Sequence, residues 1–270
     1  MRQCVIQGTA IGGDAPVRIM GVINVSHESF YSDSFVQVDS VLKAATAMVE
    51  QGASIIDIGA RSTSPYAQPI SGKTEGERID AALKELDGSG IAVSVDTMHP
   101  GVLDICLKHD IAAANDIGGF IYPAYAQKVA DAGLPAFLMA ADRQPGDPVG
   151  VEATLAALER VTRRCQDFGV KDYVLDPGVG IWTPMRSVDD DWELCRHFEE
   201  FRRFDRPLLG AVSRKTFIGM LLDRAPEDRL PGTLAVTMEL LRKGASIIRA
   251  HDVAATRDVI RVYGRMVKGT

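Results

Sequence analysis

The sequence predicts an α/β fold in which eight strands alternate with eight helices. Three observations lead to this class: short apolar runs recur along the chain, an amphipathic stretch follows each run, and the chain has 270 residues. Strands that read as unbroken apolar runs are typical of parallel sheets covered on both faces. Eight strand–helix units in roughly 250 residues close into one barrel. We therefore predict a single (β/α)8 TIM barrel with a short N-terminal segment, as one domain over residues 1–270.

The elements follow from the apolar and amphipathic stretches, taken in order. The predicted strands lie at 17–23, 54–59, 91–96, 111–116, 135–140, 172–177, 207–212 and 246–251. The predicted helices lie at 38–51, 74–88, 99–109, 122–132, 150–168, 189–203, 229–243 and 252–267. Val41 and Ala45, for example, have the spacing of one helical face. Gly52, Gly133 and Gly244 are expected to end helices, because glycine accepts the left-handed conformation after the last turn.

Composition narrows the class of protein. A doubly wound sheet is the alternative fold, but it rarely needs eight units, and no GxGxxG follows the first predicted strand. The net charge of −6 and pI near 5.4 argue against a nucleic-acid-binding surface, although a local basic cluster can still hold a small anion. No apolar run reaches the roughly 18 residues of a membrane span, and the N-terminus lacks a signal peptide's apolar core.

Cysteine usage indicates a reducing compartment. Cys4, Cys106, Cys165 and Cys195 are widely spaced, with no CxxC pair and no neighbouring metal-ligand pattern. Such residues are expected to be small buried thiols, as in cytoplasmic proteins. We therefore expect a cytoplasmic protein whose partners are small molecules and which binds neither nucleic acid nor membrane.

Chemically versatile side chains recur at the carboxyl ends of the predicted strands, which in a barrel meet on the face that carries the active site. They are Asn24, Asp57, Asp96, Asn115, Asp116, Met139, Asp176, Ser213, Lys215, Arg249 and His251. Any one Asp has a plainer role as the N-cap of the next helix, as Asp96 would be for helix 99–109. Asp57, inside an apolar run, is the weakest candidate. The joint occurrence of these residues predicts a functional site.

The remaining histidines and tryptophans have plainer interpretations. His27, His99, His109 and His197 are expected to be exposed or to cap helices. Trp182 and Trp192 are expected to serve in packing.

The set of strand-end residues suggests a division of labour. Two carboxylates and an amide suit the N–H and amino groups of a flat heterocycle, because an ionised Asp only accepts hydrogen bonds and Asn also donates. Lys215, Arg249 and His251 belong to the ends of the last two predicted strands, where barrels commonly bind phosphate. "SRKTFIG" then enters a helix whose N-terminus adds donors for an anion. Asn24 offers a hard oxygen that suits Mg²⁺ beside a diphosphate.

The motifs around these residues resemble those of the dihydropteroate synthase family, within the pterin-binding TIM-barrel superfamily. In chain order they are "IMGVINVSHESF", "GASIIDIGARST", "VSVDT", "ANDIGG", "FLM", "LDPGVGI", "GAVSRKTFIG", "GTLAV" and "IIRAHDV", over residues 15–267. The resemblance implies a transferase that joins 6-hydroxymethyl-7,8-dihydropterin diphosphate to an aromatic amine and releases diphosphate. It also implies Mg²⁺ as cofactor, diphosphate departure before amine attack, and a homodimer assembled through the later helices.

The resemblance assigns roles to individual positions. The pterin-binding residues would be Asp96, Asn115, Met139, Asp176, Lys215 and Arg249. The diphosphate would be held by Asn24, Arg249 and His251, with Mg²⁺ on Asn24. Lys215, Arg249 and His251 would be catalytic, and Thr63, Ser64, Ser213 and Thr216 would bind the arylamine.

Three loops depart from the family pattern. After Asn24 the chain reads "VSHESFYSDS" where the family has Asn-x-Thr-Pro-Asp-Ser-Phe-Ser-Asp-Gly-Gly. In the second loop, Glu-Ser-Thr-Arg-Pro-Gly becomes residues 61–66, "RSTSPY", so that Ser64 replaces the arginine that orders the arylamine. Phe-Gly-Lys after the sixth strand becomes residues 181–183, "IWT".

The first two loops look closer to archaeal relatives, which leaves the acceptor open. It is either p-aminobenzoate, in folate biosynthesis, or a ribofuranosyl-aniline phosphate, in methanopterin biosynthesis. Without the loop arginine we expect weaker use of p-aminobenzoate, unless Arg61 or Lys73 supplies the missing cation.

Two other functions remain open at this point. A pterin-dependent methyltransferase shares the barrel and the Asp and Asn contacts, but it has no need of "SRKTF" and "RAH" as diphosphate-binding devices. A non-catalytic pterin-binding paralogue would keep the ring site and lose the loops. Both predict pterin binding without amine-dependent release of diphosphate.

Overall fold

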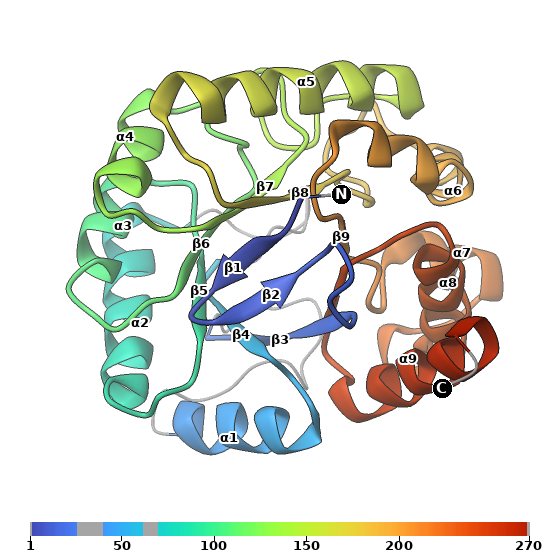
Figure 1. The fold of residues 1–270 in the computed structure, drawn as a ribbon, viewed down its shortest axis with the longest axis horizontal. Coiled ribbons are helices and arrows are strands. Elements are labelled where there is room, and N and C mark those ends of the chain that lie inside the picture. The colour runs from blue at the N-terminus through green and yellow to red at the C-terminus, as the bar shows by residue number, and fades with distance from the viewer. Residues whose placement is uncertain (1, 26–39, 62–69, 269–270) are drawn as a thin grey trace.

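A computed structural model describes residues 2–25, 40–61 and 70–268, and its centre is a sheet of eight parallel strands. The strands are β3 (Arg18–Asn24), β4 (Ile55–Gly59), β5 (Val93–Asp96), β6 (Ala113–Asp116), β7 (Ala136–Met139), β8 (Tyr173–Asp176), β9 (Leu209–Gly210) and β10 (Ile247–Ala250). Their spatial order is β8-β7-β6-β5-β4-β3-β10-β9. The ring closes between β8 and β9, where the Leu175 N–H donates to the Pro207 carbonyl at 2.9 Å. The predicted α/β barrel is confirmed (Figure 1).

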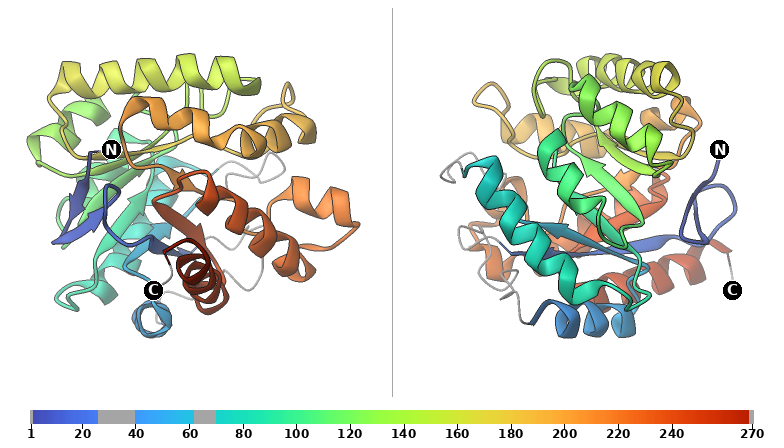
Figure 2. Two further views of the ribbon diagram at one scale, coloured as in Figure 1. Left: turned by 45° about the vertical axis from the view of Figure 1, so that its right-hand side comes forward. Right: turned by 90° about the vertical axis from the view of Figure 1, so that its left-hand side faces the viewer.

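The helices surround the sheet on its outside (Figures 1 and 2). They are α1 (Val41–Gln51), α2 (Gly72–Leu86), α3 (Pro100–Cys106), α4 (Pro123–Asp131), α5 (Gly150–Phe168), α6 (Val188–Arg196), α7 (Thr216–Leu222), α8 (Leu230–Arg242) and α9 (Val253–Lys268). In α5, Leu155, Leu158 and Cys165 are buried, so one apolar stripe faces the sheet. The predicted helix-ending glycines 52, 133 and 244 all have positive φ, which confirms their role.

The helix predicted over 189–203 differs from the structure. It divides into α6 and a 3-10 helix, η3 (Phe198–Phe204). Phe198 and Phe201 are fully buried, and residues three apart lie on the same side of a 3-10 helix. Both rings therefore point into the core.

The short segment predicted at the N-terminus forms a two-stranded hairpin of β1 (Cys4–Ile6) and β2 (Thr9–Ile11). Its Cys4, Ile6 and Ile11 belong to the same buried cluster as Met20 and Ile55, which lie near the starts of their barrel strands. The hairpin lies in front of the strands in Figure 1. It thus covers the amino end of the barrel and leaves the carboxyl ends of the strands as the other face.

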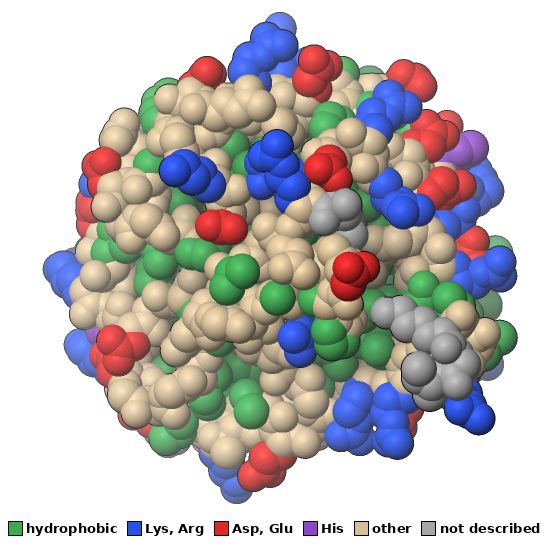
Figure 3. All heavy atoms as spheres, in the orientation of Figure 1, with side chains coloured by type: hydrophobic (Ala, Val, Ile, Leu, Met, Phe, Trp, Pro, Cys, Tyr) green, Lys and Arg blue, Asp and Glu red, His purple; other side chains and the backbone are tan. Residues whose placement is uncertain are grey.

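The surface mixes both signs of charge. Around the face seen in Figure 3, Lys and Arg side chains alternate with Asp and Glu side chains, with apolar atoms between them. All four cysteines are buried and free, as predicted. Among the helices of residues 2–25, 40–61 and 70–268, none has both the length and the apolarity needed to cross a bilayer.

The expectation that His109 is exposed or caps a helix is wrong. Its side chain is only 7% exposed and lies between two carboxylates. Nδ1 lies 2.7 Å from Asp87 and Nε2 lies 3.1 Å from Asp80. Burial alone would lower the pKa of His109, but the hydrogen bonds to Asp87 and Asp80 outweigh it and the pKa is raised. These contacts tie the end of α2 to the turn after α3.

His109 predicts a pH dependence of folding stability. The pKa of His109 in the folded protein is raised above its ordinary value of 6.5. The contribution of His109 to the free energy of unfolding is therefore fully present below pH 6.5 and is lost as pH rises through the pKa of the folded protein. Replacing His109 by Gln should therefore flatten the fall in unfolding free energy above pH 6.5, measured by urea titration. His197→Gln removes a half-exposed histidine bonded to one carboxylate, Glu200, and is the matched control. If the unfolding free energy of His109→Gln falls with pH as steeply as that of wild type, Asp80 and Asp87 do not stabilise the fold through a protonated His109.

Candidate active site

The carboxyl ends of the strands bring most of the predicted residues together. Asn24, Asp96, Asp116, Met139 and Asp176 are the last residues of β3, β5, β6, β7 and β8. Neighbouring strands hold Asn24 opposite Gly59, Asp96 opposite Asn115, and Met139 opposite Asp176. Because the hydrogen-bonded register fixes these pairs, the ring of strand ends is part of the rigid barrel.

Arg249 on β10 is the centre of this ring. Its Nε donates to Asp57 at 2.7 Å and its Nη2 donates to Asp96 at 2.9 Å. Burial alone would lower the pKa of Arg249, but the Asp57 and Asp96 carboxylates raise it. One guanidinium therefore joins β4, β5 and β10, and both carboxylates are directed at the same cation.

Asp57 is more important to the site than its sequence context suggested. It is fully buried, and it also accepts a hydrogen bond from the Asn115 amide at 2.9 Å. The sequence carried a usable signal, because a carboxylate inside an otherwise apolar strand requires a buried partner. The structure shows that the partners are Arg249 and Asn115.

Asp96 does not cap the following helix. Its carboxylate pairs with Arg249, and His99 occupies the N-cap position of α3. Burial raises the pKa of Asp96 to about 7; the Arg249 charge opposes this rise and the Asp57 charge adds to it. Asp96 therefore takes up a proton more readily than an ordinary Asp side chain, while its ion pair with Arg249 favours the carboxylate.

Asp116 has a local role instead. Its two oxygens accept from the N–H groups of Gly118 at 2.7 Å and Phe120 at 2.8 Å, which fixes the turn after β6. Its pKa is raised to about 6 by burial. The carboxylate of Asp116 therefore shapes its own loop.

Lys215 lies beside the turn that follows β8. Its ammonium donates to the carbonyl of Val179 and lies 5.2 Å from the centre of the Trp182 ring. Burial lowers the pKa of Lys215, while the charges of Asp176 and Asp191 oppose that shift. The Trp182 indole donates to Gly178 at 2.9 Å, so this residue borders the site rather than serving only in packing.

Asp176 and Met139 complete this side of the ring. Burial raises the pKa of Asp176, and the Lys215 charge together with a hydrogen bond from the Gly178 N–H at 2.7 Å restrains the rise. A Cβ at Gly178 would lie 2.9 Å from Met139, so the turn passes directly over that side chain. The carboxylate of Asp176, the ammonium of Lys215 and the apolar side chain of Met139 therefore lie close together.

His251 and Ser213 link the last two strand ends. The Ser213 hydroxyl lies 2.9 Å from His251 Nδ1, and it also accepts from the His251 N–H at 3.2 Å. Burial, followed by the Arg249 charge, lowers the pKa of His251 to about 4. The imidazole is therefore neutral at pH 7 in the free protein, whereas the sequence grouped it with the cations.

Arg214 and Asp252 are functional neighbours that the sequence analysis missed. Arg214 has a positive φ of 54° and makes two hydrogen bonds to Asp252, at 2.8 and 2.7 Å. It stands between Ser213 and Lys215, while Asp252 follows His251. This bidentate pair fixes the two chain segments that carry the cationic side of the site.

A second cluster lies beside the ring. Glu75, 1% exposed, accepts from Arg61 at 2.9 Å and from the Thr97 hydroxyl at 2.6 Å, and His99 Nδ1 lies 3.3 Å away. Arg61 also donates to the carbonyl of Ile70 at 2.9 Å. The guanidinium of Arg61 is thus committed to α2 and to the chain just before it.

The predicted arylamine residues divide into two groups. Thr63 and Ser64 lie outside the described residues. Ser213 lies 2.9 Å from His251, and Thr216 is the first residue of α7, directly after the N-cap residue Lys215. The described pair therefore stands beside the cationic end of the ring.

The arrangement suits a flat, polar ligand with an anionic tail. Asp96, Asp176 and Asn115 offer acceptors, and Lys215 and Arg249 offer charged donors. Within residues 2–25, 40–61 and 70–268, no group of three or more His, Cys, Asp or Glu side chains is placed to hold a metal ion.

Comparisons with known proteins agree with this geometry. A family model described as pterin binding enzyme matches residues 20–251. Dihydropteroate synthase of Escherichia coli K12 is 34% identical over 270 residues, which covers 95% of this chain and 93% of the relative.

Two solved structures of dihydropteroate synthases are also similar to this chain. A Coxiella burnetii dihydropteroate synthase in complex with pteroic acid has a TM-score of 0.86 and 28% identity, with 98% of each chain covered. A Xanthomonas albilineans dihydropteroate synthase in complex with 7,8-dihydropteroate has a TM-score of 0.83 and 26% identity, with both chains covered in full.

Proposed function

We propose that this chain, which belongs to the dihydropteroate synthase family of pterin-binding enzymes, joins 6-hydroxymethyl-7,8-dihydropterin diphosphate to p-aminobenzoate and releases diphosphate. It is a transferase of folate biosynthesis. The observation that carries the proposal is the hydrogen-bonded group of Arg249, Asp57, Asp96 and Asn115, which stands beside Lys215 and Asp176 at the carboxyl face of the barrel. A pterin ring presents N–H, amino and carbonyl groups at its edge, and this group offers matching acceptors and donors.

The pterin ring is assigned to the centre of the face. Asp96, Asn115 and Asp176 accept from its N–H groups, Lys215 donates to its carbonyl and ring nitrogen, and Met139 supports one face. The donors of Arg249 that point to Asp57 and Asp96 lie in the guanidinium plane, so its flat surface is the part suited to stacking on the ring. Arg249 thereby acts on both the ring and the adjoining diphosphate.

The diphosphate is assigned to Asn24, Arg249 and His251. In the free protein the neutral His251 can donate one hydrogen bond, and an anion beside it would favour its protonation. Asn24 would hold Mg²⁺ at this end of the site through its amide oxygen, because Mg²⁺ prefers hard oxygen ligands and keeps few protein ligands. When bound, it supplies positive charge beside the leaving group.

The reaction breaks one C–O bond and forms one C–N bond. The electron pair of the bond between the exocyclic carbon and oxygen leaves with diphosphate, and the positive charge spreads into the pterin. The amine nitrogen then attacks that carbon and loses its proton to water. Aniline nitrogens are unprotonated at neutral pH, so charge placed in advance by Lys215 and Arg249 contributes more than a strong base would.

The expected preference for a larger amine stays a prediction. Two residues were candidates to replace the missing loop arginine. Arg61 is held by Glu75 and Ile70, and the side chain of Lys73 is 85% exposed on α2 beside Glu77. Neither contact supports a role as the cation for the carboxylate of p-aminobenzoate. A ribofuranosyl-aniline phosphate, whose anionic group lies farther out, would depend less on that cation.

Incorporation of the amine tests the proposed function. Purified protein is incubated with the pterin diphosphate, Mg²⁺ and either p-aminobenzoate or the ribofuranosyl-aniline phosphate, and kcat/KM is measured for each product. Formation of dihydropteroate supports the proposal, and a higher value for the larger amine supports the prediction on acceptor choice. Methyl transfer from a methylated pterin, or pterin binding without product, would contradict the proposal.

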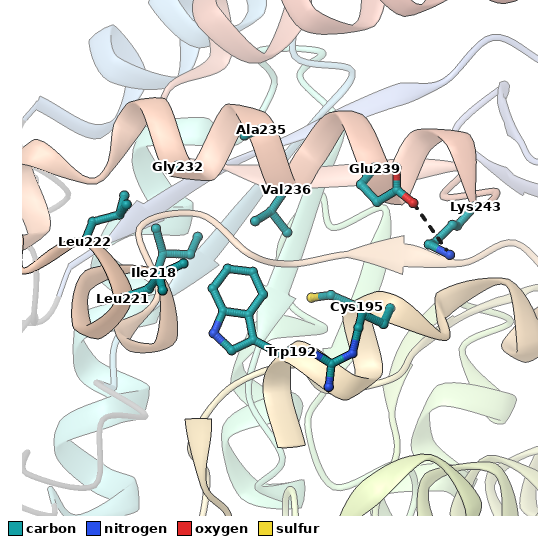
Figure 4. Close-up of a pocket in the computed structure, with 11 residues that line it drawn as sticks. Trp192, Cys195, Ile218, Leu221, Leu222, Gly232, Ala235, Val236, Glu239 and Lys243 are labelled. Atoms are coloured by element: carbon teal, nitrogen blue, oxygen red, sulfur yellow. Dashed lines mark ion pairs between the residues drawn. The ribbon is translucent and has the colours of Figure 1, made fainter. Parts of the chain in front are cut away.

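We also propose a homodimer assembled through α6, α7 and α8. An apolar groove of about 450 Å³ runs between these helices (Figure 4). Trp192, Cys195, Ile218, Leu221, Leu222 and Val236 line it. Met220 and Leu221 on α7 are 63% and 65% exposed. Large exposed apolar side chains at an apolar groove are typical of an interface between subunits.

The dimer proposal predicts a change of mass in solution. Leu221→Glu introduces a charge into the apolar surface, so the protein should elute as a monomer in size exclusion with light scattering. Val49→Glu, at a 41% exposed apolar position on α1, is the matched control and should leave the mass unchanged. A wild-type monomer at micromolar concentration would contradict the proposal.

We also propose that the protein is cytoplasmic. Its four cysteines are buried and free, which is typical of proteins kept in a reducing compartment.

A further inference from the structure

A fully buried ion pair lies next to the site and has no assigned role in the reaction. The side chains of Arg186 and Asp191 are each 1% exposed, and Arg186 Nη2 lies 3.2 Å from Asp191 Oδ1. Arg186 precedes α6 and Asp191 lies within it. Removing two charges from water is costly and is rarely repaid by their attraction alone. The additional contacts of the pair indicate what it does.

Both members of the pair hold the turn that follows β8. Arg186 Nη1 donates to the carbonyl of Gly178 at 2.8 Å, and Asp191 Oδ1 accepts from the N–H of Gly180 at 2.6 Å. Gly178 and Gly180 have φ values of 72° and 143°, a region that side-chain-bearing residues rarely adopt. The turn is therefore fixed on both sides of Val179.

The fixed residue is the one that contacts Lys215. The carbonyl of Val179 accepts a hydrogen bond from the Lys215 ammonium. A Cβ on Gly180 would lie 3.1 Å from that nitrogen, so the turn and the ammonium are in close contact. The position of this turn thus determines where the charged end of Lys215 lies.

We propose that Arg186 and Asp191 are positioning residues that hold the 178–180 turn so that Val179 orients the Lys215 ammonium toward the pterin ring. The identity of the ligand rests on the proposed function; the fixing of the turn does not. The pair acts through Lys215 and does not itself touch the substrate. Its loss should weaken pterin binding and leave the arylamine subsite unaffected.

Three double variants separate positioning from simple stabilisation. Arg186→Met or Asp191→Leu alone leaves one buried charge without its partner and should lower stability. Arg186→Met/Asp191→Leu removes both charges and should recover stability. It should nevertheless raise the Kd for 6-hydroxymethylpterin by about tenfold, since the hydrogen bonds to the turn are gone. Arg186→Met/Asp191→Asn keeps an acceptor for Gly180 and should regain about threefold of that affinity. Arg186→Met/Asp191→Ala is the smaller apolar reference and should bind as weakly as the Met/Leu variant.

The measurements are pterin Kd by fluorescence titration, KM for the amine, and hydrogen exchange of the Gly180 amide without ligand. Positioning predicts a higher Kd, an unchanged amine KM, and exchange about tenfold faster in the Met/Leu variant. Arg206→Met is the matched control, because Arg206 donates to the carbonyl of Lys171 at the other end of β8. It should change neither the Kd nor Gly180 exchange.

Two results would overturn the inference. Wild-type pterin affinity in a stable Met/Leu variant would make the pair merely structural, and so would unchanged Gly180 exchange. Failure of the proposed function is recognised separately, as a wild-type protein that forms no dihydropteroate. Exchange at Gly180 still tests the fixing of the turn in that case.

Discussion

Replacement of Arg249 by Ala is expected to lower kcat/KM for the pterin diphosphate by about 30- to 1,000-fold, which corresponds to about 2–4 kcal/mol of transition-state stabilisation. Arg249 is the only residue of the described site that bonds both Asp57 and Asp96, and it is also the cation assigned to the diphosphate. Its loss removes charge where the leaving group departs. It also leaves two neighbouring carboxylates without their shared cation.

The effect of the unpaired carboxylates on stability can be measured separately from the loss of activity. Asp57 is fully buried, so an unpaired carboxylate there should lower the unfolding free energy by about 3–5 kcal/mol. Urea titration of Arg249→Ala measures this cost, and Arg249→Lys is the control that keeps the charge without the planar donor pair. We expect Arg249→Lys to lie between wild type and Arg249→Ala in both measurements. Full activity in Arg249→Ala would remove Arg249 from the site.

Replacement of Asp176 or Asp96 by Ala is expected to abolish measurable pterin binding. Each carboxylate is assigned charge-assisted hydrogen bonds to the ring, worth about 1.5–3 kcal/mol apiece, and several are lost together. Asp176→Ala is the cleaner test, because Asp96 also pairs with Arg249 at 2.9 Å. The measurement is pterin Kd by fluorescence quenching. Asp110→Ala, at the far end of the barrel before β6, is a control that should bind pterin normally.

Asp96 adds a pH dependence to this prediction. Burial raises its pKa to about 7, so the protonated, neutral form accumulates as pH falls below that value. The ring N–H groups require the carboxylate as acceptor, and wild-type affinity should therefore decline on the acid side of pH 7. In Asp96→Asn this decline should be absent, with weak binding throughout. An acid decline that persists in Asp96→Asn would assign it to another group.

The sequence predicted the barrel because its strands are unbroken apolar runs and its helices are amphipathic. It predicted the site because parallel strands end on one face. Asp96, Asn115 and Asp176 were found in this way. Partners far apart in the chain could not be read from spacing. The contact between Asp57 and Arg249 joins residues 192 positions apart, and His109 meets Asp80 and Asp87 only after α2 and α3 pack together.

The contacts of the turn after β8 could not be predicted from the sequence either, although the residues involved are close together in the chain. The residues "DPGVG" (176–180) are typical of a turn, but nothing in the sequence indicated that Arg186 and Asp191 would be buried behind it. The direction of a side chain depends on where α6 docks against the barrel. The hairpin of β1 and β2 was missed for a similar reason: its strands have three residues each, too few for a period to be visible.

The measurement that tests the central claim most directly is the ratio of diphosphate released to dihydropteroate formed in one reaction mixture, with and without p-aminobenzoate. If the ring of strand-end residues aligns the pterin diphosphate for condensation, the two products should appear in equal amounts, and omission of the amine should remove most of the diphosphate signal. Diphosphate release that is independent of the amine, or pterin binding with neither product, would contradict the account.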